Sequence, residues 1–548
     1  MTWIQKTKIL VAALALMFWN MASAQEDEKG YVSGNFQVDG QTYRKDSLTG
    51  AEDVPEQMLI NAFGNLRYTY GKLTAGLRFE AYLNTLQGIS KNYDGTGIPY
   101  KYFTYRNEEL EFTVGNFYEQ FGTGVSLRAY EDKMLGIDNA FEGVLTRYNP
   151  VQGIFLKGLV GKQRNYFSLG PGIVRGIDGE MNLNETFRLD SLTTQIIIGG
   201  SFVSKYQPDR NPTLILPENV SLAASRLNLQ HNGFSLQTEY AYKINDPSAD
   251  NLNNYQPGQV LISDLSYNTS HYGVLVGFKW INNMSFRSDR AAQENQLLIN
   301  YLPSITRNHV YSLAAMYPYA TQLNGEAGVK GEIFYRFQRE TFLGGKYGTL
   351  VTISYSRVNN IDTTNLPMWD SVHPHPDHYK TKFLSVGDTR YFEDFAIEIQ
   401  KKISPNLNST WQLQYTAYNK KVLEGKDGMI EALIAIADIT YKFRPQHSLR
   451  TEFQYLNTKQ DHGDWFSGTL EYTVSPHFFV AIVDQYNFGN PEADRQLHYY
   501  MVRGGYTRGA NRIQVGYGRQ RMGVICIGGV CRIVPASTGF NFSISSTF

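Results

Sequence analysis

The chain has 548 residues, with 51 basic against 51 acidic side chains, and 14% of its residues are aromatic. This balance argues against nucleic acid as a partner and gives no sign of a charged cargo. After residue 24, no run of 18 consecutive apolar residues occurs, which excludes helical membrane spans. Abundant Tyr and a mean hydropathy of −0.35 instead favour a membrane β-barrel, in which half of the strand positions face lipid and half face water.

The first 24 residues have the pattern of a secretory signal peptide. Lys6 and Lys8 form a basic head, an apolar run follows, and Ala-Ser-Ala at 22–24 supplies the small residues that signal peptidase recognises. The apolar run is too short for a transmembrane helix, so a retained anchor is the less favoured alternative. We therefore expect a signal peptide at 1–24 and a β-barrel of the bacterial outer membrane at 25–548.

From Gly30 onward, apolar and polar residues alternate with the two-residue period of a strand whose faces differ. In 73–82, Leu, Ala and Phe alternate with residues that include Arg78 and Glu80. The same alternation recurs in 234–243, 329–338 and 449–455. Frequent charges on the inward face are tolerable only where the inside is wet or filled with polar protein. The pattern predicts an all-β fold, a single large antiparallel transmembrane β-barrel of about 20 to 26 strands, with a best count of 26, in preference to a soluble sandwich.

Tight turns alternate with longer loops, as short periplasmic turns and longer outer loops would. Gly, Pro and Asn mark the tight turns, for example at 70–72, 231–233, 404–406 and 508–510. Longer connections lie at 45–57, 85–98, 117–139 and 358–389, and the strand assignment is most prone to error at 297–325. A first strand near 31–38 should pair with a last strand near 540–548, because an open edge in lipid leaves backbone groups unpaired. Both ends should then lie in the periplasm.

The segment 117–139 is too long for a tight turn and concentrates charge among Gly and aromatic residues. Its charged residues are Glu119, Arg128, Glu131, Asp132, Lys133 and Asp138. A barrel of this size encloses a lumen that its own side chains cannot fill, and the early start of strand-like sequence leaves no room for an N-terminal plug domain. We expect this loop to fold inward and narrow the lumen beside Glu80, with Arg78 and Arg147 as cationic partners. The alternative is an ordinary surface loop.

The same segment carries a resemblance. Residues 115–124 read Gly-Asn-Phe-Tyr-Glu-Gln-Phe-Gly-Thr-Gly, and the similarity continues through 128–132 and 136–140. This pattern resembles a family of Bacteroidota outer-membrane proteins classed as a domain of unknown function. The resemblance covers most of the mature chain and implies a barrel in that lineage's outer membrane, without an assigned activity. The resemblance leaves two roles open, a channel and a fixed subunit of a secretion or barrel-assembly machine, and does not choose between them.

Candidate chemistry is sparse. His373, His375 and His378 lie close together in the longest loop and have side chains that can bind metal, but a Pro-rich polar loop is the commoner explanation. Ser, His and Asp occur without the spacing of a hydrolase motif. Gly-Thr-Gly at 122–124 lacks the Lys and the helix of a phosphate loop. We therefore predict no enzyme activity, no cofactor and no metal site.

The two cysteines, Cys526 and Cys531, flank a Gly-Gly pair at 528–529 that fits a two-residue hairpin turn. Cys526 then faces Cys531 across the ribbon. Since the periplasmic route is oxidising, we predict a disulfide that closes the last outer loop.

The last ten residues alternate and end on an aromatic side chain. They resemble the C-terminal strand by which bacterial outer-membrane barrels engage their assembly machinery. The residues of this assembly signal are Phe540, Phe542, Ile544 and Phe548. The expected partners are therefore the barrel-assembly machinery and outer-membrane lipid.

Two function classes remain. The favoured one is a channel or transporter for polar solutes, narrowed by the in-folded loop. The alternative is a non-conducting barrel subunit of an outer-membrane secretion or barrel-assembly complex. An occluded lumen or apolar outer loops would be signs of the alternative, and Leu-rich stretches at 214–217 and 366–369 are candidates. The solute and the oligomeric state are not specified by the sequence.

Overall fold

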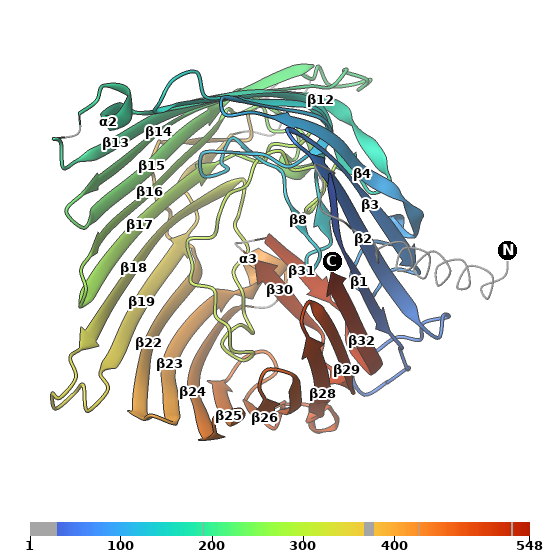
Figure 1. Ribbon diagram of the computed structural model, residues 1–548, viewed down its shortest axis with the longest axis vertical. Coiled ribbons are helices and arrows are strands. Elements are labelled where there is room, and N and C mark those ends of the chain that lie inside the picture. The colour runs from blue at the N-terminus through green and yellow to red at the C-terminus, as the bar shows by residue number, and fades with distance from the viewer. Residues whose placement is uncertain (1–29, 190, 367–376, 427, 528–529) are drawn as a thin grey trace.

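The computed structural model describes residues 30–189, 191–366, 377–426, 428–527 and 530–548. The described residues form a closed ring of 24 antiparallel strands (Figure 1). The first strand, β1 (Tyr31–Gln41), pairs with the last, β32 (Ser537–Thr547), and this pairing closes the ring. The predicted single antiparallel barrel is thus confirmed, with 24 strands in place of the best count of 26.

Strands that follow one another in the ring are neighbours in the chain, apart from short elements in the loops. The first half of the ring continues through β2 (Leu59–Tyr70), β3 (Leu73–Leu83), β4 (Gly95–Arg106), β5 (Leu110–Phe117), β10 (Phe141–Tyr148), β11 (Ile154–Asn165), β12 (Ser168–Asn182), β13 (Gln195–Tyr206), β14 (Asn219–His231), β15 (Phe234–Lys243), β16 (Gly258–Asn268) and β17 (Tyr272–Asn282). The second half consists of β18 (Gly325–Phe337), β19 (Thr349–Asn359), β22 (Arg390–Ser404), β23 (Leu407–Asn419), β24 (Met429–Arg444), β25 (His447–Thr458), β26 (Trp465–Val474), β27 (Phe478–Tyr486), β28 (His498–Arg508) and β29 (Asn511–Gln520) before β32.

The loops contain short elements of their own. The short strands pair as β6 (Gln120–Phe121) with β7 (Leu127–Arg128), β8 (Glu131–Asp132) with β9 (Ile137–Asp138), β20 (Thr363–Asn365) with β21 (Tyr379–Thr381), and β30 (Gly523–Ile527) with β31 (Val530–Val534). The helical turns are η1 (Lys91–Tyr93), α2 (Leu183–Thr186), η2 (Ala249–Asn251), α3 (Lys420–Glu424) and η3 (Ala493–Arg495). None of the helices in the described part of the chain is long and apolar enough to cross a membrane.

The barrel strands place apolar residues outside and charged residues inside. On β3, Leu77 is 38% exposed on the outer face, whereas Arg78 and Glu80 are 3% and 1% exposed in the lumen. On β25, Phe453 is exposed and the neighbouring Glu452 is buried. A water-soluble protein would bury the apolar face, so this inversion shows that the outer face is covered by lipid. An even-numbered barrel with an apolar exterior and a charged interior lies in the outer membrane of a bacterium.

The two ends of the barrel differ. The end that holds the start of β1 and the close of β32 has mainly tight turns, including the predicted ones at 70–72, 231–233, 404–406 and 508–510. We call it the turn end, and it faces the periplasm in bacterial barrels. The opposite end, the loop end, has the long connections, including those predicted at 45–57, 117–139 and 358–389. Among the described residues, the only long connections between strands at the turn end are 183–194 and 338–348.

A segment of 42 residues, 283–324, leaves the ring between β17 and β18 and lies inside it. In Figure 1 its lime-green to yellow trace runs through the interior of the ring. We call it the inner strap, and residues 118–140 the inner loop. Phe286, Ile299 and Leu313 of the strap are fully buried. Apolar residues that pack on the inner wall resemble lipid-facing residues in sequence. For this reason the assignment of strands from sequence is most prone to error at 297–325.

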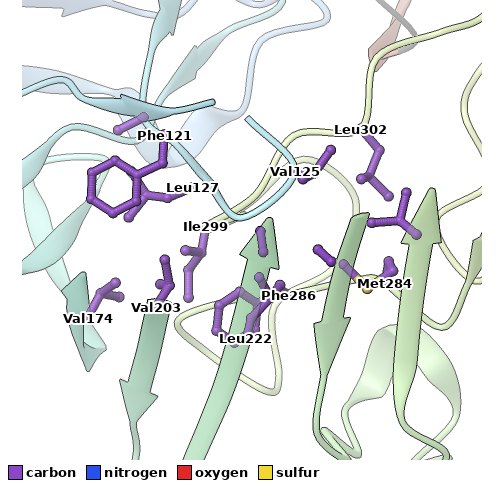
Figure 2. Packing of buried hydrophobic residues seen from close by; sticks show 14 of the residues in the cluster. Phe121, Val125, Leu127, Val174, Val203, Leu222, Met284, Phe286, Ile299 and Leu302 are labelled. Carbon is purple, nitrogen blue, oxygen red and sulfur yellow. The ribbon is translucent and has the colours of Figure 1, made fainter. Parts of the chain in front are cut away.

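Hydrophobic packing joins the inner segments to the wall. Figure 2 shows Phe121 and Leu127 of the inner loop near Val203 of β13, with Phe286 of the strap beside Leu222 of β14. A second cluster packs the later part of the strap against strands β19 to β26. Full burial of one such side chain is worth about 1.5–3 kcal/mol. The barrel interior therefore contains a true protein core on two sides of the lumen.

The β30–β31 hairpin carries the predicted disulfide. Cys526 and Cys531 are bonded, face each other in the register, and have Cα atoms 4.1 Å apart. The turn at 528–529 lies outside the described residues. The amide of the Asn295 side chain donates to the carbonyl oxygen of Cys531 at 2.8 Å, so the hairpin contacts the inner strap.

We expect the unreduced, denatured protein to take up no thiol reagent, and to take up two equivalents per chain after reduction. The closed loop is short, so replacing both cysteines by Ser should cost only about 2 kcal/mol of unfolding free energy. Mass spectrometry of the labelled protein checks the first expectation and denaturant titration the second. Two labelled thiols per unreduced chain would refute the bond.

Candidate functional site

The inner loop enters the lumen between β5 and β10, which stay paired up to Phe117 opposite Phe141. Gly122 and Gly124 have φ of +51° and +100°, values that favour glycine. The amide of Thr123 donates to Glu239 of β15 at 2.8 Å. A Cβ atom at residue 122 would lie 2.6 Å from the Glu239 carboxylate. Glycine at 122 is therefore required for the loop to approach the wall this closely.

Five charged side chains join the inner loop to the barrel wall near β3. Arg78 forms ion pairs with Glu80 at 2.7 Å, with Glu131 at 3.0 Å and with Asp138. Arg164 of β11 pairs with Glu80 and with Asp138, each at 2.5 Å. The side chains of Arg78, Glu80 and Arg164 are at most 4% exposed. Charges buried this deeply are tolerated only when they are paired, so this cluster ties the loop to the wall.

A second ion-pair cluster anchors the start of the inner loop. Glu119 contacts Arg147 of β10 at 2.8 Å and Lys157 of β11 at 3.0 Å. Arg147 also pairs with Glu111 of β5. The wall residues Arg78 and Arg147, expected from the sequence as partners, thus lie against acidic residues of the loop. Lys157 and Arg164 were missed: inward alternation along β11 would have identified Lys157, whereas Arg164 is out of phase with it because the register shifts between Lys162 and Arg164.

The other charged residues of the loop have different surroundings. Arg128 lies over the rings of Tyr130 and Tyr301, at 4.7 and 4.0 Å from their centroids. Lys133 lies over the Phe63 ring at 4.0 Å, and burial lowers the pKa of its ammonium group. Asp132 accepts a hydrogen bond from the amide of Leu135 at 3.0 Å. Burial raises the pKa of Glu131 despite the ion pair with Arg78.

Two polar residues of the loop were not singled out from the sequence. The Tyr118 hydroxyl donates to Asp138 at 2.9 Å. The Asn139 side chain donates to the carbonyl of Leu298 at 2.9 Å and accepts from the amide of Tyr130 at 2.7 Å. Both residues lie in the stretch on which the family resemblance depends.

The inner strap was not predicted. Its first half is held by two wall lysines that are at most 1% exposed, Lys243 and Lys279. Lys279 donates to the carbonyl of Pro303 at 2.7 Å and pairs with Glu326 at 2.5 Å. Lys243 donates to the carbonyl of Ser285. Long cationic side chains therefore reach from the wall to backbone oxygens of the strap.

The second half of the strap crosses the opposite wall. Its polar contacts reach β22, β25 and β27, and they join Arg307 to Glu398 (2.6 Å), His309 to Asp394 (3.1 Å), the Leu313 amide to Gln454 (2.8 Å) and Ser312 to Gln485 (2.8 Å). The strap also binds the inner loop through backbone hydrogen bonds. These run from Arg128 to Ile299 at 2.8 Å and from Tyr301 to Gly124 at 2.9 Å. Loop and strap therefore form one connected body inside the barrel.

At the loop end, this inner body and the outer loops enclose a cavity of about 960 Å³. Its wall includes residues 135–139 of the inner loop, 294–298 and 300–302 of the strap, and 530–533 of the disulfide hairpin. This cavity is the candidate binding site.

The remaining predicted sites lie elsewhere. Phe540 and Phe548 of the last strand region are exposed on the barrel, and their role as an assembly signal stays a prediction. His373 and His375 lie outside the described residues, whereas the amide of His378 donates to Asn254 at 3.3 Å. Within the described ranges, no group of three His, Cys, Asp or Glu residues has the geometry of a metal site.

The sequence profile of a family of unknown function, DUF6029, matches residues 4–548. The chain belongs to DUF6029. No curated protein matches it. Solved structures show weak similarity to this DUF6029 chain. The translocation pore of the P pilus usher PapC has a TM-score of 0.41 and 8% identity, covering 94% of this chain and 99% of the usher chain.

Two receptors of Pseudomonas aeruginosa are similarly distant. The ferric enterobactin receptor PfeA has a TM-score of 0.42 and 12% identity, over 96% of this chain and 81% of the receptor chain. The siderophore receptor PirA has a TM-score of 0.39 and 9% identity, over 96% and 82%. Similarity this low carries no argument about function.

We expect Arg78→Met to lower the free energy of unfolding by about 3–5 kcal/mol, because it leaves Asp138, Glu131 and Glu80 with a buried excess of negative charge. Urea unfolding in detergent micelles, followed by the gel mobility of unheated samples, measures this loss. The matched control is Arg67→Met on β2, since Arg67 is exposed and has no ion pair among the described residues. An equal loss in both variants would show that the buried cluster does not hold the inner loop.

Proposed function

We propose that the protein is a channel or transporter for polar solutes, in which the inner loop and the inner strap define the path through the barrel. The cavity at the loop end carries this proposal. It is a space between the inner body and the outer loops, lined by both polar and apolar residues, where a solute arriving from outside would first be held. We propose binding and passage, and no catalysis.

The lumenal contacts support a controlled path more than an open pore. The inner loop and strap are held to the wall by paired charges and by two hydrophobic clusters. A barrel of 24 strands without such contents would be wide enough for an aqueous channel. The inner body therefore reduces the free cross-section and supplies fixed polar groups along it. From the resemblance at 115–124 we also propose a Bacteroidota origin.

The alternative is a non-conducting subunit of a secretion or barrel-assembly complex. Of the apolar stretches noted in the sequence, 214–217 places Ile215 at 88% exposure on an outer loop. Residues 367–369 of the other stretch lie outside the described residues. A single exposed apolar side chain is normal on a protein surface, so it gives the alternative no specific support.

Planar bilayer recordings test the proposal, and the strand register supplies the variants. β17 and β18 remain paired up to Asn282 opposite Gly325, so a two-residue Asn-Gly turn can replace 283–324 without moving a strand. A short Gly-Ser turn can likewise replace 118–140. We expect the intact protein to conduct weakly and each replacement to raise single-channel conductance severalfold, because each removes part of the inner body.

The control replaces 338–348 at the turn end, where Phe337 stays paired with Thr349, and should leave conductance unchanged. Unchanged conductance in both inner variants would place the loop and strap outside the conducting path. A silent intact protein that opens only after replacement, and that co-purifies with a stoichiometric set of envelope proteins, would favour the complex subunit.

A further inference from the structure

Beside its aliphatic residues, the cavity at the loop end is lined mainly by tyrosines and side-chain amides. Among the described residues, six tyrosines line it: Tyr93, Tyr130, Tyr166, Tyr301, Tyr379 and Tyr391. Eight Asn or Gln residues join them, against three acidic and three basic residues. Tyrosine offers an apolar ring face with a polar tip, and a side-chain amide both donates and accepts hydrogen bonds.

The charges of the lining compensate one another. Asp138 pairs with Arg164 at 2.5 Å, and Asp250 pairs with Arg287 at 3.1 Å. The other two charged residues, Glu294 and Arg532, have opposite signs. Because three acidic residues balance three basic ones, the wall as a whole has no net charge to attract a charged ligand. The lining therefore favours a neutral solute.

Costly backbone conformations position part of this wall. Tyr166, Glu294 and Leu297 have φ of 59°, 53° and 51°. These values lie in the left-handed region, which residues other than Gly, Asn and Asp rarely adopt. Tyr166 is the first of two residues in the β11–β12 turn, where a type II′ turn normally has glycine. Backbone strain of this kind persists where the surroundings impose it, and it concentrates at functional sites.

Buried contacts fix the strained residues in place. Arg287 is 2% exposed and donates to the carbonyl oxygens of Gln296 at 2.7 Å and Glu294 at 2.6 Å. The Gln296 side chain donates to the Tyr166 hydroxyl at 2.8 Å. The Tyr166 ring packs edge-on against Tyr93, with centroids 4.7 Å apart. An aromatic ring and an amide are thus held together at the cavity wall before any ligand arrives.

We propose that this cavity binds a neutral polyhydroxylated solute, an oligosaccharide chain in particular. Sugar hydroxyls donate and accept as the amides do, and the C–H faces of sugar rings pack on aromatic faces. Ligand cavities measure about 300–1,000 Å³, so this one, at about 960 Å³, suits several linked rings better than one. The inference rests on the proposed function and names the class of solute that it carries.

Titration calorimetry of the full chain tests the proposal. The protein is held in a polyoxyethylene detergent, because maltoside head groups would compete. The probes are maltohexaose and cellohexaose as neutral chains, hexagalacturonate as an anionic chain and an uncharged hexapeptide. We expect a neutral hexaose to bind, and the anionic chain and the peptide to bind at least roughly tenfold more weakly, which corresponds to about 1.4 kcal/mol.

Two variants address the wall directly. Tyr166→Asn removes the ring while keeping a residue that tolerates the left-handed conformation, and Gln296→Ala removes the amide. Each should weaken binding about tenfold. Tyr347→Asn, at the turn end, is the matched control and should bind as the wild type does. If Tyr166→Asn does not fold, Gln296→Ala decides.

Binding of neither neutral hexaose, tighter binding of hexagalacturonate or peptide, or unchanged affinity in Gln296→Ala would overturn the proposal. Calorimetry does not depend on conduction. If the protein does not conduct in bilayers but still binds a neutral hexaose, the channel is rejected and the saccharide site is retained. If the protein conducts but binds neither hexaose, the saccharide site is rejected and the channel is retained.

Discussion

The architecture depends on one requirement, that no backbone amide or carbonyl be left unpaired in lipid. The pairing of β1 with β32 satisfies it by closing the ring. A ring of 24 strands is too wide for its own inward side chains to fill, so closure creates an interior that needs other contents. The inner loop and the inner strap supply them. The buried charges on the wall, such as Arg78 and Lys279, then find their partners in these two segments.

The barrel was predictable because its signal is local. Each strand shows the two-residue period over its own length, as Leu77, Arg78 and Glu80 show on β3. The closing pair was also predictable, since both partners lie at the ends of the barrel sequence. The cysteine pair needed only the geometry of a two-residue turn. For the individual strands and for the cysteine pair, the evidence lies within about ten residues, the span of one strand.

The lumen was only partly predictable because its contacts join distant segments. The charge and length of 117–139 indicated an inward loop, and acids of that loop lie against Arg78 and Arg147. The strap had no such mark, since Phe286 and Ile299 are as apolar as lipid-facing residues. Nothing local reveals that Lys279 bonds the carbonyl of Pro303. Whether an apolar residue faces lipid or a protein core depends on which segment packs against it. Local sequence does not indicate that segment.

The path of the strap has a consequence for the order of assembly. Ser312 of the strap accepts a hydrogen bond from Gln485 of β27, a residue 173 positions later in the chain. Contacts this distant in sequence form late, because the closure of the intervening chain costs entropy before the contact repays it. When β17 and β18 first pair, most of the strap's far wall does not yet exist. The strap can therefore pack fully only after the later strands have formed. The interior then reaches its final structure at the same stage as the closing pairing of β1 with β32.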